Sequence, residues 1–272
     1  MNSATNIPTL PEKLNFLTPL AWEELIRVGN ANDGGYLIPE SIVKQTRFLV
    51  SMGVCLDWSF EEDFLRIVPG IGVHAYDHTV SVWTIRRFAL FGVIKCLIGK
   101  SSFHEVRRRM RVLKSYGEFF TKQATHYQER ICDKAQFNFD ATADRVMERA
   151  QTNNVFIKMD IEGWEYQVID DILKHSERII GLAVEFHDTM SRRSAFIQAV
   201  EKLLEKYQIA HIHGNNWSPV GDDGLPDVLE LTFVRNDKSD TACRRIEFPI
   251  PQLDQPNNPD LSDYAFRFNL HS

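Results

Sequence analysis

Short apolar runs alternate with amphipathic stretches along most of the chain. An apolar run at residues 46–54 precedes a predicted helix at 57–68, and a second apolar run at 70–79 follows. A strand, a helix and a strand within about thirty residues match one βαβ unit. The alternation resumes after residue 139 with RVMERAQ, VFIKMD, EYQVIDDILKH, IIGLAVEFHD, SAFIQAVEKLLEKYQ, IAHIHG and VLELTFVR. We therefore predict an α/β fold with a mostly parallel sheet and helices on both faces.

The order of elements divides the chain into three parts. Residues 1–45 form an entry segment, with a short helix at 22–28 followed by a turn and strand at NDGGYLIP. Residues 46–240 form the main domain, within which 82–135 is a helical, basic insertion. Residues 241–272 are rich in Pro and Asn and predict an extended tail on the surface.

Composition narrows the class of protein. The 272 residues include 31 Lys and Arg against 37 Asp and Glu, and the net charge of −6 disfavours a protein that wraps nucleic acid. The four cysteines form no C-x-x-C pair, which indicates reduced thiols without a zinc site. The first residues lack a signal-peptide pattern, so we expect a cytoplasmic protein. The apolar run at 88–98 contains Lys95 and has about half of the ~20 residues that a membrane span needs.

The ends of the first two predicted strands carry candidate binding residues. Ligands of doubly wound sheets bind at the carboxyl ends of the strands, where Gly53, Val54 and Asp57 follow the first run and Asp77 follows the second. An acid at that place can accept hydrogen bonds from ribose hydroxyls. The chain has no G-x-G-x-x-G, so a cofactor with a ribose but without a pyrophosphate fits better than a dinucleotide. A simple turn with a surface Asp is the alternative.

Later strand ends are rich in ionisable side chains. KMDIEGWE holds Lys158 and Asp160, VEFHD holds Glu185 and His187, and HIHGNN holds His213. One use for such a group is general base catalysis by a neutral His, and another is a divalent metal bound by Asp160, Glu185 and His213. The structural alternative is that Asp160 caps the next helix, Lys158 pairs with a neighbour and the histidines are satisfied core groups.

The run RRRMRVLK at 107–114 is basic within an acidic chain. A solvated helix face is the favoured interpretation. A contact with a phosphorylated or acidic substrate, or with an anionic membrane surface together with Trp83, is the functional alternative.

Several of these motifs together resemble one family. LVSMGVCLDWSFEEDF, HAYDHT, FIKMDIEGWEYQVI, VEFH and HIHGNN before PDVLELTFVR resemble the FkbM-type methyltransferases, which use S-adenosylmethionine (SAM), and NDGGYLIP is similar to their entry segment. The resemblance spans most of residues 27–235. It implies a Rossmann-like class I methyltransferase fold, with a seven-stranded sheet that is parallel except for its last strand.

The resemblance also implies roles for individual residues. Gly53 with its neighbours Val54 and Asp57 would face the methionine end of SAM, Asp77 would bind the ribose, and Asp160 would lie near the sulfonium and the acceptor. Members of the family methylate hydroxyl groups of sugars and natural products.

Two functional hypotheses follow. The first is an O-methyltransferase whose acceptor is a sugar hydroxyl in a glycan, a lipopolysaccharide or a natural product. His187 and His213 would act as base or as ligands of Mg or Mn, with Glu185, Lys158 and Asp160 beside them. The second is a non-catalytic scaffold with the same fold, attached to a membrane or glycan assembly through residues 83–114. A nucleic-acid acceptor is disfavoured, because the chain has no motif for a flipped base. The oligomeric state stays open.

Overall fold

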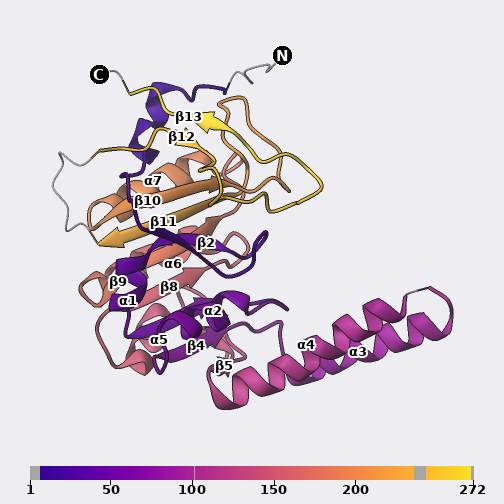
Figure 1. The fold of residues 1–272 in the computed structure, drawn as a ribbon. Helices are drawn as coiled ribbons and strands as arrows, with labels where there is room; N and C mark the ends of the chain where they lie inside the picture. Colours follow the sequence, from indigo (N-terminus) through magenta and orange to yellow (C-terminus); the bar gives the residue numbers. More distant parts are fainter. Residues whose placement is uncertain (1–6, 101, 236–242, 271–272) are drawn as a thin grey trace.

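A seven-stranded sheet forms the centre of the molecule. The computed structural model describes residues 7–100, 102–235 and 243–270. Its main sheet has the order β10-β11-β9-β8-β3-β4-β5 (Figure 1). The strands are β3 (Phe48–Met52), β4 (Gly72–Tyr76), β5 (Thr125–Tyr127), β8 (Val155–Met159), β9 (Ile179–Phe186), β10 (Tyr207–Gly214) and β11 (Leu229–Arg235). Only β11 among them runs antiparallel to its neighbours. The predicted mostly parallel seven-stranded sheet is confirmed.

Helices connect the parallel strands and cover the sheet. The helical elements of the body are α1 (Glu40–Gln45), α2 (Ser59–Ile67), α5 (Ala143–Ala150), α6 (Glu165–Leu173), α7 (Arg193–Leu204) and the 3₁₀ turns η1 (Glu12–Leu17) and η2 (Ser176–Arg178). Every residue of β8 and β9 is buried. Strands of a parallel sheet are buried on both faces, which explains why these segments have nearly continuous apolar runs.

The entry segment differs from its prediction at one element. Residues 25–28 form strand β1 (Leu25–Val28), and the predicted helix at 22–28 is wrong. This strand pairs antiparallel with β2 (Tyr36–Pro39). Gly29 closes the hairpin with a φ of +97°, and a Cβ there would lie 2.4 Å from the Gly34 carbonyl oxygen. Pairing with a partner further along the chain therefore overrides the local helical pattern.

The segment expected as a helical insertion contains two helices and two short strands. Helices α3 (Val82–Leu97) and α4 (Phe103–Lys122) form an antiparallel hairpin that projects from the body (Figure 1). The chain then enters β5, the edge strand of the main sheet, and β6 (Arg130–Ile131), which pairs with β7 (Asp140–Ala141). The strands are too short to show an alternating pattern, so the sequence did not separate them from the helices.

The C-terminal segment packs against the end of the sheet. Strands β12 (Glu247–Phe248) and β13 (Phe266–Arg267) pair there, and Phe248, Phe266 and Phe268 are buried in the main core. This burial differs from the expected extended surface tail, because the aromatic side chains fill the space beside β10. The division of the chain into domains stays a prediction.

A buried ionic network ties this segment to β10. His213 Nδ1 lies 3.2 Å from Glu230 Oε2, and His213 Nε2 lies 3.0 Å from Asp263 Oδ1. Burial lowers the pKa of His213, but the hydrogen bonds with Asp263 and Glu230 outweigh burial and raise the pKa to about 10. A protonated His213 therefore holds together β10, β11 and the C-terminal segment.

We predict that His213 makes stability dependent on pH. The folded pKa lies above the unfolded value of about 6.5, so the contribution is complete below pH ~6.5 and is lost as pH rises toward 10. His213→Gln should lower the free energy of unfolding by about 3 kcal/mol near pH 6.5, because it leaves buried carboxylates unpaired. Urea unfolding of both proteins from pH 6.5 to 10 should show this difference shrinking. A difference that is constant with pH would contradict the assignment.

Candidate active site

Two loops cross at the carboxyl end of the sheet, with Gly53 at the point of contact. Gly53 has a φ of +78°, and a Cβ on it would lie 1.7 Å from the Asp160 carbonyl oxygen. The Gly53 amide donates to the Tyr76 carbonyl at 2.9 Å, and the Asp160 amide donates to the Met52 carbonyl at 2.9 Å. Only glycine fits here, so this residue fixes how closely the loops after β3 and β8 approach.

Lys158 stabilises the same loop crossing from the interior of the protein. Its side chain is 7% exposed, and its Nζ donates to the Gly53 carbonyl at 2.9 Å. Burial lowers the pKa of Lys158, but the negative charges of Asp160, Glu61 and Glu185 outweigh burial and raise it. Lys158 is thus a cation that holds the loop, and the acids around it balance its charge, while its predicted catalytic role stays a prediction.

Asp77 organises the loops after β3 and β4. Its Oδ2 accepts from the amides of Val54 at 3.2 Å and Cys55 at 2.9 Å. Its Oδ1 accepts from the amide of Thr79 at 2.8 Å and from the Thr79 hydroxyl at 2.6 Å. Burial raises the pKa of Asp77, but these hydrogen bonds outweigh it and lower the pKa. A carboxylate accepts about four hydrogen bonds, so Asp77 is already satisfied by its own chain.

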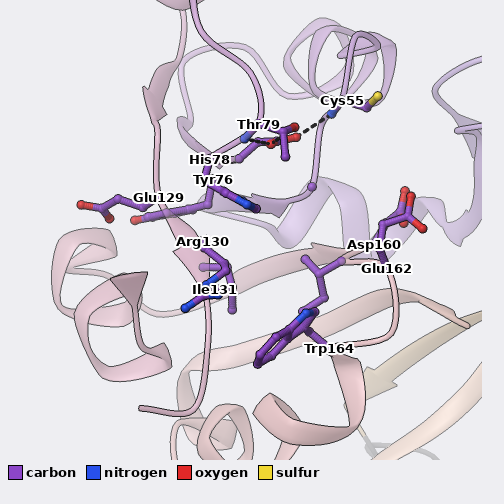
Figure 2. A pocket seen from close by; sticks show the side chains of 13 residues that line it. Cys55, Tyr76, His78, Thr79, Glu129, Arg130, Ile131, Asp160, Glu162 and Trp164 are labelled. Atoms are coloured by element: carbon purple, nitrogen blue, oxygen red, sulfur yellow. Dashed lines mark hydrogen bonds between the residues drawn. The ribbon is translucent and has the colours of Figure 1, made fainter. Parts of the chain in front are cut away.

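A first cavity of about 300 Å³ lies above this loop system. Arg130 and Trp164 form one side of it, with the Arg130 guanidinium 5.3 Å from the Trp164 ring centre (Figure 2). The lining residues come from the end of β4, from strand β6 and from the loops after β3, β4, β5 and β8, and are Gly53, Cys55, Tyr76, Asp77, His78, Thr79, Glu129, Arg130, Ile131, Asp160, Ile161, Glu162 and Trp164. The cavity is large enough for a nucleoside-sized ligand.

A second cavity of about 380 Å³ adjoins the first, and Cys55, Asp160 and Glu162 line both. The second cavity is rich in carboxylates, with a smaller number of cationic and amide groups. Its remaining lining residues are Asp33, Gly34, Val54, Leu56, Asp57, Phe60, Arg108, Lys158, Glu185, His187 and Asn215. Of the residues predicted to bind a cofactor, Val54 and Asp57 therefore lie in the second cavity, Gly53 and Asp77 in the first, and Asp160 in both.

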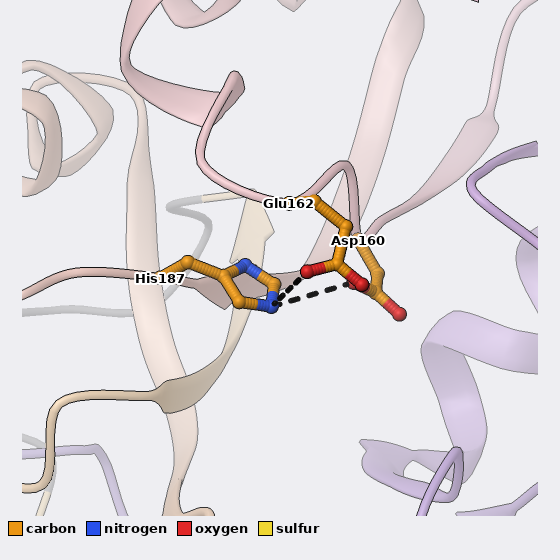
Figure 3. Close-up of side chains that lie close together, drawn as sticks. All are labelled: Asp160, Glu162 and His187. Atoms are coloured by element: carbon orange, nitrogen blue, oxygen red, sulfur yellow. Dashed lines mark ion pairs between the residues drawn. The ribbon is translucent and has the colours of Figure 1, made fainter. Parts of the chain in front are cut away.

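In the second cavity, His187 faces a group of acids (Figure 3). Its Nε2 lies 3.8 Å from Asp160 Oδ1 and 3.6 Å from Glu162 Oε2. Its Nδ1 lies 3.2 Å from Glu165 Oε1, a buried oxygen that also accepts from the amides of Ile161 and Gly163. Glu165 therefore orients both the imidazole and the loop that carries Asp160. Among the described residues, Asp160, Glu162 and His187 have ligand atoms close enough to one another to hold one metal ion.

Burial and the neighbouring charges shift the pKa values of His187 and Glu185. Burial lowers the pKa of His187, but the hydrogen bond and charge of Glu165 and the charges of Glu185 and Asp160 outweigh it and raise the pKa to about 9. Burial raises the pKa of Glu185 well above its ordinary value, and the charges of Asp160 and Glu230 act in the same direction. The Tyr36 hydroxyl and the Asn215 amide donate to Glu185 at 3.2 Å and 3.0 Å.

The structure does not bring His213 into the candidate group of ligands. Its two ring nitrogens contact Glu230 and Asp263, and it lines neither cavity. His213 lies on β10, opposite Glu230 of β11, and Glu230 in turn lies opposite Glu185 of β9. Strand β11 therefore separates His213 from Glu185. The compact group is Asp160, Glu162 and His187, in place of the predicted Asp160, Glu185 and His213.

Sequence reasoning also missed Tyr36, Arg130 and Trp164. Tyr36 comes from the entry hairpin, Arg130 follows the edge strand β5, and Trp164 precedes α6. Trp164 lies within the motif KMDIEGWE. Its large side chain next to Gly163 was the one feature of the sequence that could have marked it as a site residue. Tyr36 and Arg130 reach the site through contacts between distant segments that no local pattern reveals.

Comparison with known proteins agrees with this geometry. Residues 136–209 match the model of the methyltransferase FkbM domain. This stretch, which is less than a third of the chain, is therefore similar to a methyltransferase domain of the FkbM type. The match runs from the segment before α5 into β10 and includes Lys158, Asp160 and His187. The resemblance inferred from the motifs is confirmed, and the match supports a SAM-dependent methyltransferase.

Three solved structures show weak similarity to the chain. The fibrillarin/Nop5p complex aligns with a TM-score of 0.38 and 9% identity, over 70% of this chain and 73% of that one. Precorrin-6y C5,15-methyltransferase from Geobacter metallireducens GS-15 aligns with 0.35 and 10%, over 72% and 87%. The mitomycin 7-O-methyltransferase MmcR aligns with 0.30 and 12%, over 72% of this chain and 53% of that one. No curated protein matches the chain. None of these scores supports a particular substrate.

We predict that Gly53→Ala disrupts the loop crossing, because the added Cβ would overlap the Asp160 carbonyl. The matched control is Gly70→Ala, since Gly70 has a similar φ of +85° but no atom within 4 Å of an added Cβ. Both variants carry the strain of a positive φ, about 1 kcal/mol. Thermal unfolding should show a loss for Gly53→Ala at least ~2 kcal/mol larger than for Gly70→Ala. Equal losses would remove the crowding argument.

Proposed function

We propose that the protein is an O-methyltransferase that transfers the methyl group of SAM to a hydroxyl group of a sugar-containing acceptor. The observation that carries this proposal is the pair of adjoining cavities joined at Cys55, Asp160 and Glu162. A transfer between two bound molecules needs two neighbouring sites with a shared boundary, so that donor and acceptor are held in line. The cytoplasmic location and the sugar acceptor stay predictions.

The first cavity fits SAM. Gly53 leaves bare backbone on one wall of the cavity, and Ile131 and Trp164 offer apolar surface for the adenine ring of SAM. Asp160 and Glu162 place negative charge beside its sulfonium. The proposed ribose role of Asp77 needs one adjustment, because Thr79 and two amides occupy its oxygens. A ribose hydroxyl would replace the Thr79 hydroxyl as a donor to Oδ1.

The second cavity suits an acceptor with several hydroxyl groups. Carboxylates of Asp33, Asp57 and Glu162 line it, and a carboxylate accepts hydrogen bonds from hydroxyls without donating any. Asn215 and Arg108 add donors for ring or glycosidic oxygens. A sugar presents this mixture of donors and acceptors, whereas an anionic acceptor would be repelled by the acids.

Residues at the boundary would prepare the acceptor. When bound, SAM supplies an electrophilic methyl carbon on a positively charged sulfur. Asp160 lies at the boundary and orients the acceptor hydroxyl, while Nε2 of His187, oriented by Glu165, takes the hydroxyl proton. His187 can accept a proton only when its imidazole is neutral. A cation beside Asp160 favours the neutral imidazole, because it offsets the negative charges that raise the pKa of His187.

A divalent metal is a second candidate use of the same cluster. The Glu165 contact at Nδ1 leaves Nε2 free for a metal, an arrangement common for ligating histidines. Asp160 and Glu162 would add carboxylate oxygens, which Mg²⁺ and Mn²⁺ accept. The ion would then orient and acidify the acceptor hydroxyl in place of an imidazole base.

We predict that His187→Gln lowers turnover by about 10²-fold or more, because it removes the proton acceptor, while SAM affinity stays within about threefold. His175→Gln is the matched control, since His175 pairs with Asp144 at the surface and lines neither cavity. Release of S-adenosylhomocysteine in the presence of a panel of sugars measures turnover, and calorimetry measures SAM affinity.

The outcomes separate the two chemical roles. Turnover by wild-type protein that survives EDTA supports His187 as the base, whereas turnover lost in EDTA and restored by Mn²⁺ assigns the cluster to a metal. Unchanged turnover in His187→Gln, with or without EDTA, would contradict both roles.

A further inference from the structure

The α3–α4 hairpin packs on the body at its base. Trp58 and Tyr116 pack there with their ring centres 5.6 Å apart, and the Trp58 indole donates to Ser115 Oγ at 3.0 Å. Beyond this contact the two helices pack on each other and extend away from the sheet (Figure 1). The methyl-transfer chemistry proposed above leaves most of the hairpin unexplained.

Helix α3 is apolar on two faces, and α4 covers one of them. Ile85, Ala89 and Gly92 are buried against α4, where a Cβ on Gly92 would lie 2.5 Å from Arg109 Cδ. The opposite face is apolar and exposed, with Trp83 63%, Leu90 59%, Phe91 50%, Ile94 43%, Leu97 81% and Ile98 60% exposed. A helix that is hydrophobic all round is expected to be covered on all sides or to meet lipid.

The hairpin is also strongly basic. Residues 82–122 hold ten Lys and Arg against two Glu, which gives a net charge of +8 in a chain of −6. The rest of the chain therefore has a net charge of −14. On α4, Arg107, Arg111 and Lys114 are exposed and line one shallow apolar depression together with Phe103 and Met110. Positive charge and exposed apolar surface are thus concentrated on the same projection.

The end of the hairpin has the side chains of an interfacial anchor. Leu97, Ile98 and Phe103 are exposed there, and Lys100 lies between them in the chain. The Arg107 guanidinium lies 5.0 Å from the Phe103 ring centre at this end, and at the start of α3 the Arg87 guanidinium lies 4.5 Å from the Trp83 ring centre. Aromatic rings that pair with cations are suited to the boundary between apolar chains and charged headgroups.

We propose that the α3–α4 hairpin binds the surface of an anionic lipid bilayer, with Leu97, Ile98 and Phe103 inserted among the lipids. The +8 charge complements anionic headgroups, and the apolar tip provides the burial that charge alone does not. Two such hairpins repel each other, which disfavours a dimer formed hairpin to hairpin. No helix among the described residues is long and apolar enough to cross a membrane. The hairpin therefore lies at the surface.

Docking would bring the second cavity close to the lipid. Arg108 lines this cavity and stands five residues after Phe103 on α4, which is about 7.5 Å along the helix axis. The lipid contact itself does not depend on methyl transfer, because it rests on the surface of the hairpin alone.

Flotation of the full chain with vesicles tests the proposal. The vesicles contain phosphatidylcholine with or without about 30 mol% phosphatidylglycerol, a composition close to physiological negative charge. The tip variant combines Leu97→Ser, Ile98→Ser and Phe103→Ser, and the control combines Trp217→Ser and Leu261→Ser, which are exposed apolar residues outside the hairpin. The wild type and the control should float only with anionic vesicles. The tip variant should bind at least about tenfold more weakly.

Two results would overturn the proposal. One is wild-type protein that stays unbound with anionic vesicles, or a tip variant that binds as well as the wild type. The other is a wild-type dimer in sedimentation that the tip substitutions dissociate, because the apolar face would then be covered by a second copy. Thermal unfolding of the tip variant without SAM monitors the fold and keeps this test separate from the proposed enzymatic function.

Discussion

The contact between the loops after β3 and β8 determines the rest of the site. Gly53 passes so close to the Asp160 carbonyl that no side chain fits between them. The buried ammonium of Lys158 holds the Gly53 carbonyl from the interior. Because this crossing is fixed, Cys55 and Asp160 end up on the shared boundary of two cavities. The separation between the two cavities therefore originates in one glycine and one lysine.

Negative charge is the second organising feature. Asp160, Glu162, Glu165 and Glu185 surround His187, and the protein balances them with Lys158 and with the proton on the imidazole. Such a cluster is costly unless a cation completes it. A sulfonium donor and a divalent metal are both cations, which is why one arrangement supports either chemical role. The rest of the chain also carries more acidic than basic residues, in contrast to the basic α3–α4 hairpin.

The sequence predicted the fold well because the central strands are long and apolar. Strands β8 and β9 are buried throughout, and the polar residues at their carboxyl ends pointed to Asp160, Glu185 and His187 from the sequence pattern alone. His213 shows the limit of that reasoning. It has the same pattern at the end of β10, but the antiparallel strand β11 lies between β10 and β9, so its partners are Glu230 and Asp263. Strand order is a long-range property that periodicity along the chain does not contain.

Calorimetric titration of the full chain with SAM is the decisive test of the proposed SAM site. We expect one site per chain with a Kd on the order of 1–100 μM, displaced by S-adenosylhomocysteine, because the cavity of about 300 Å³ has bare backbone at Gly53 and acids that suit a sulfonium. Folded protein that binds neither molecule, with or without Mn²⁺, would contradict it.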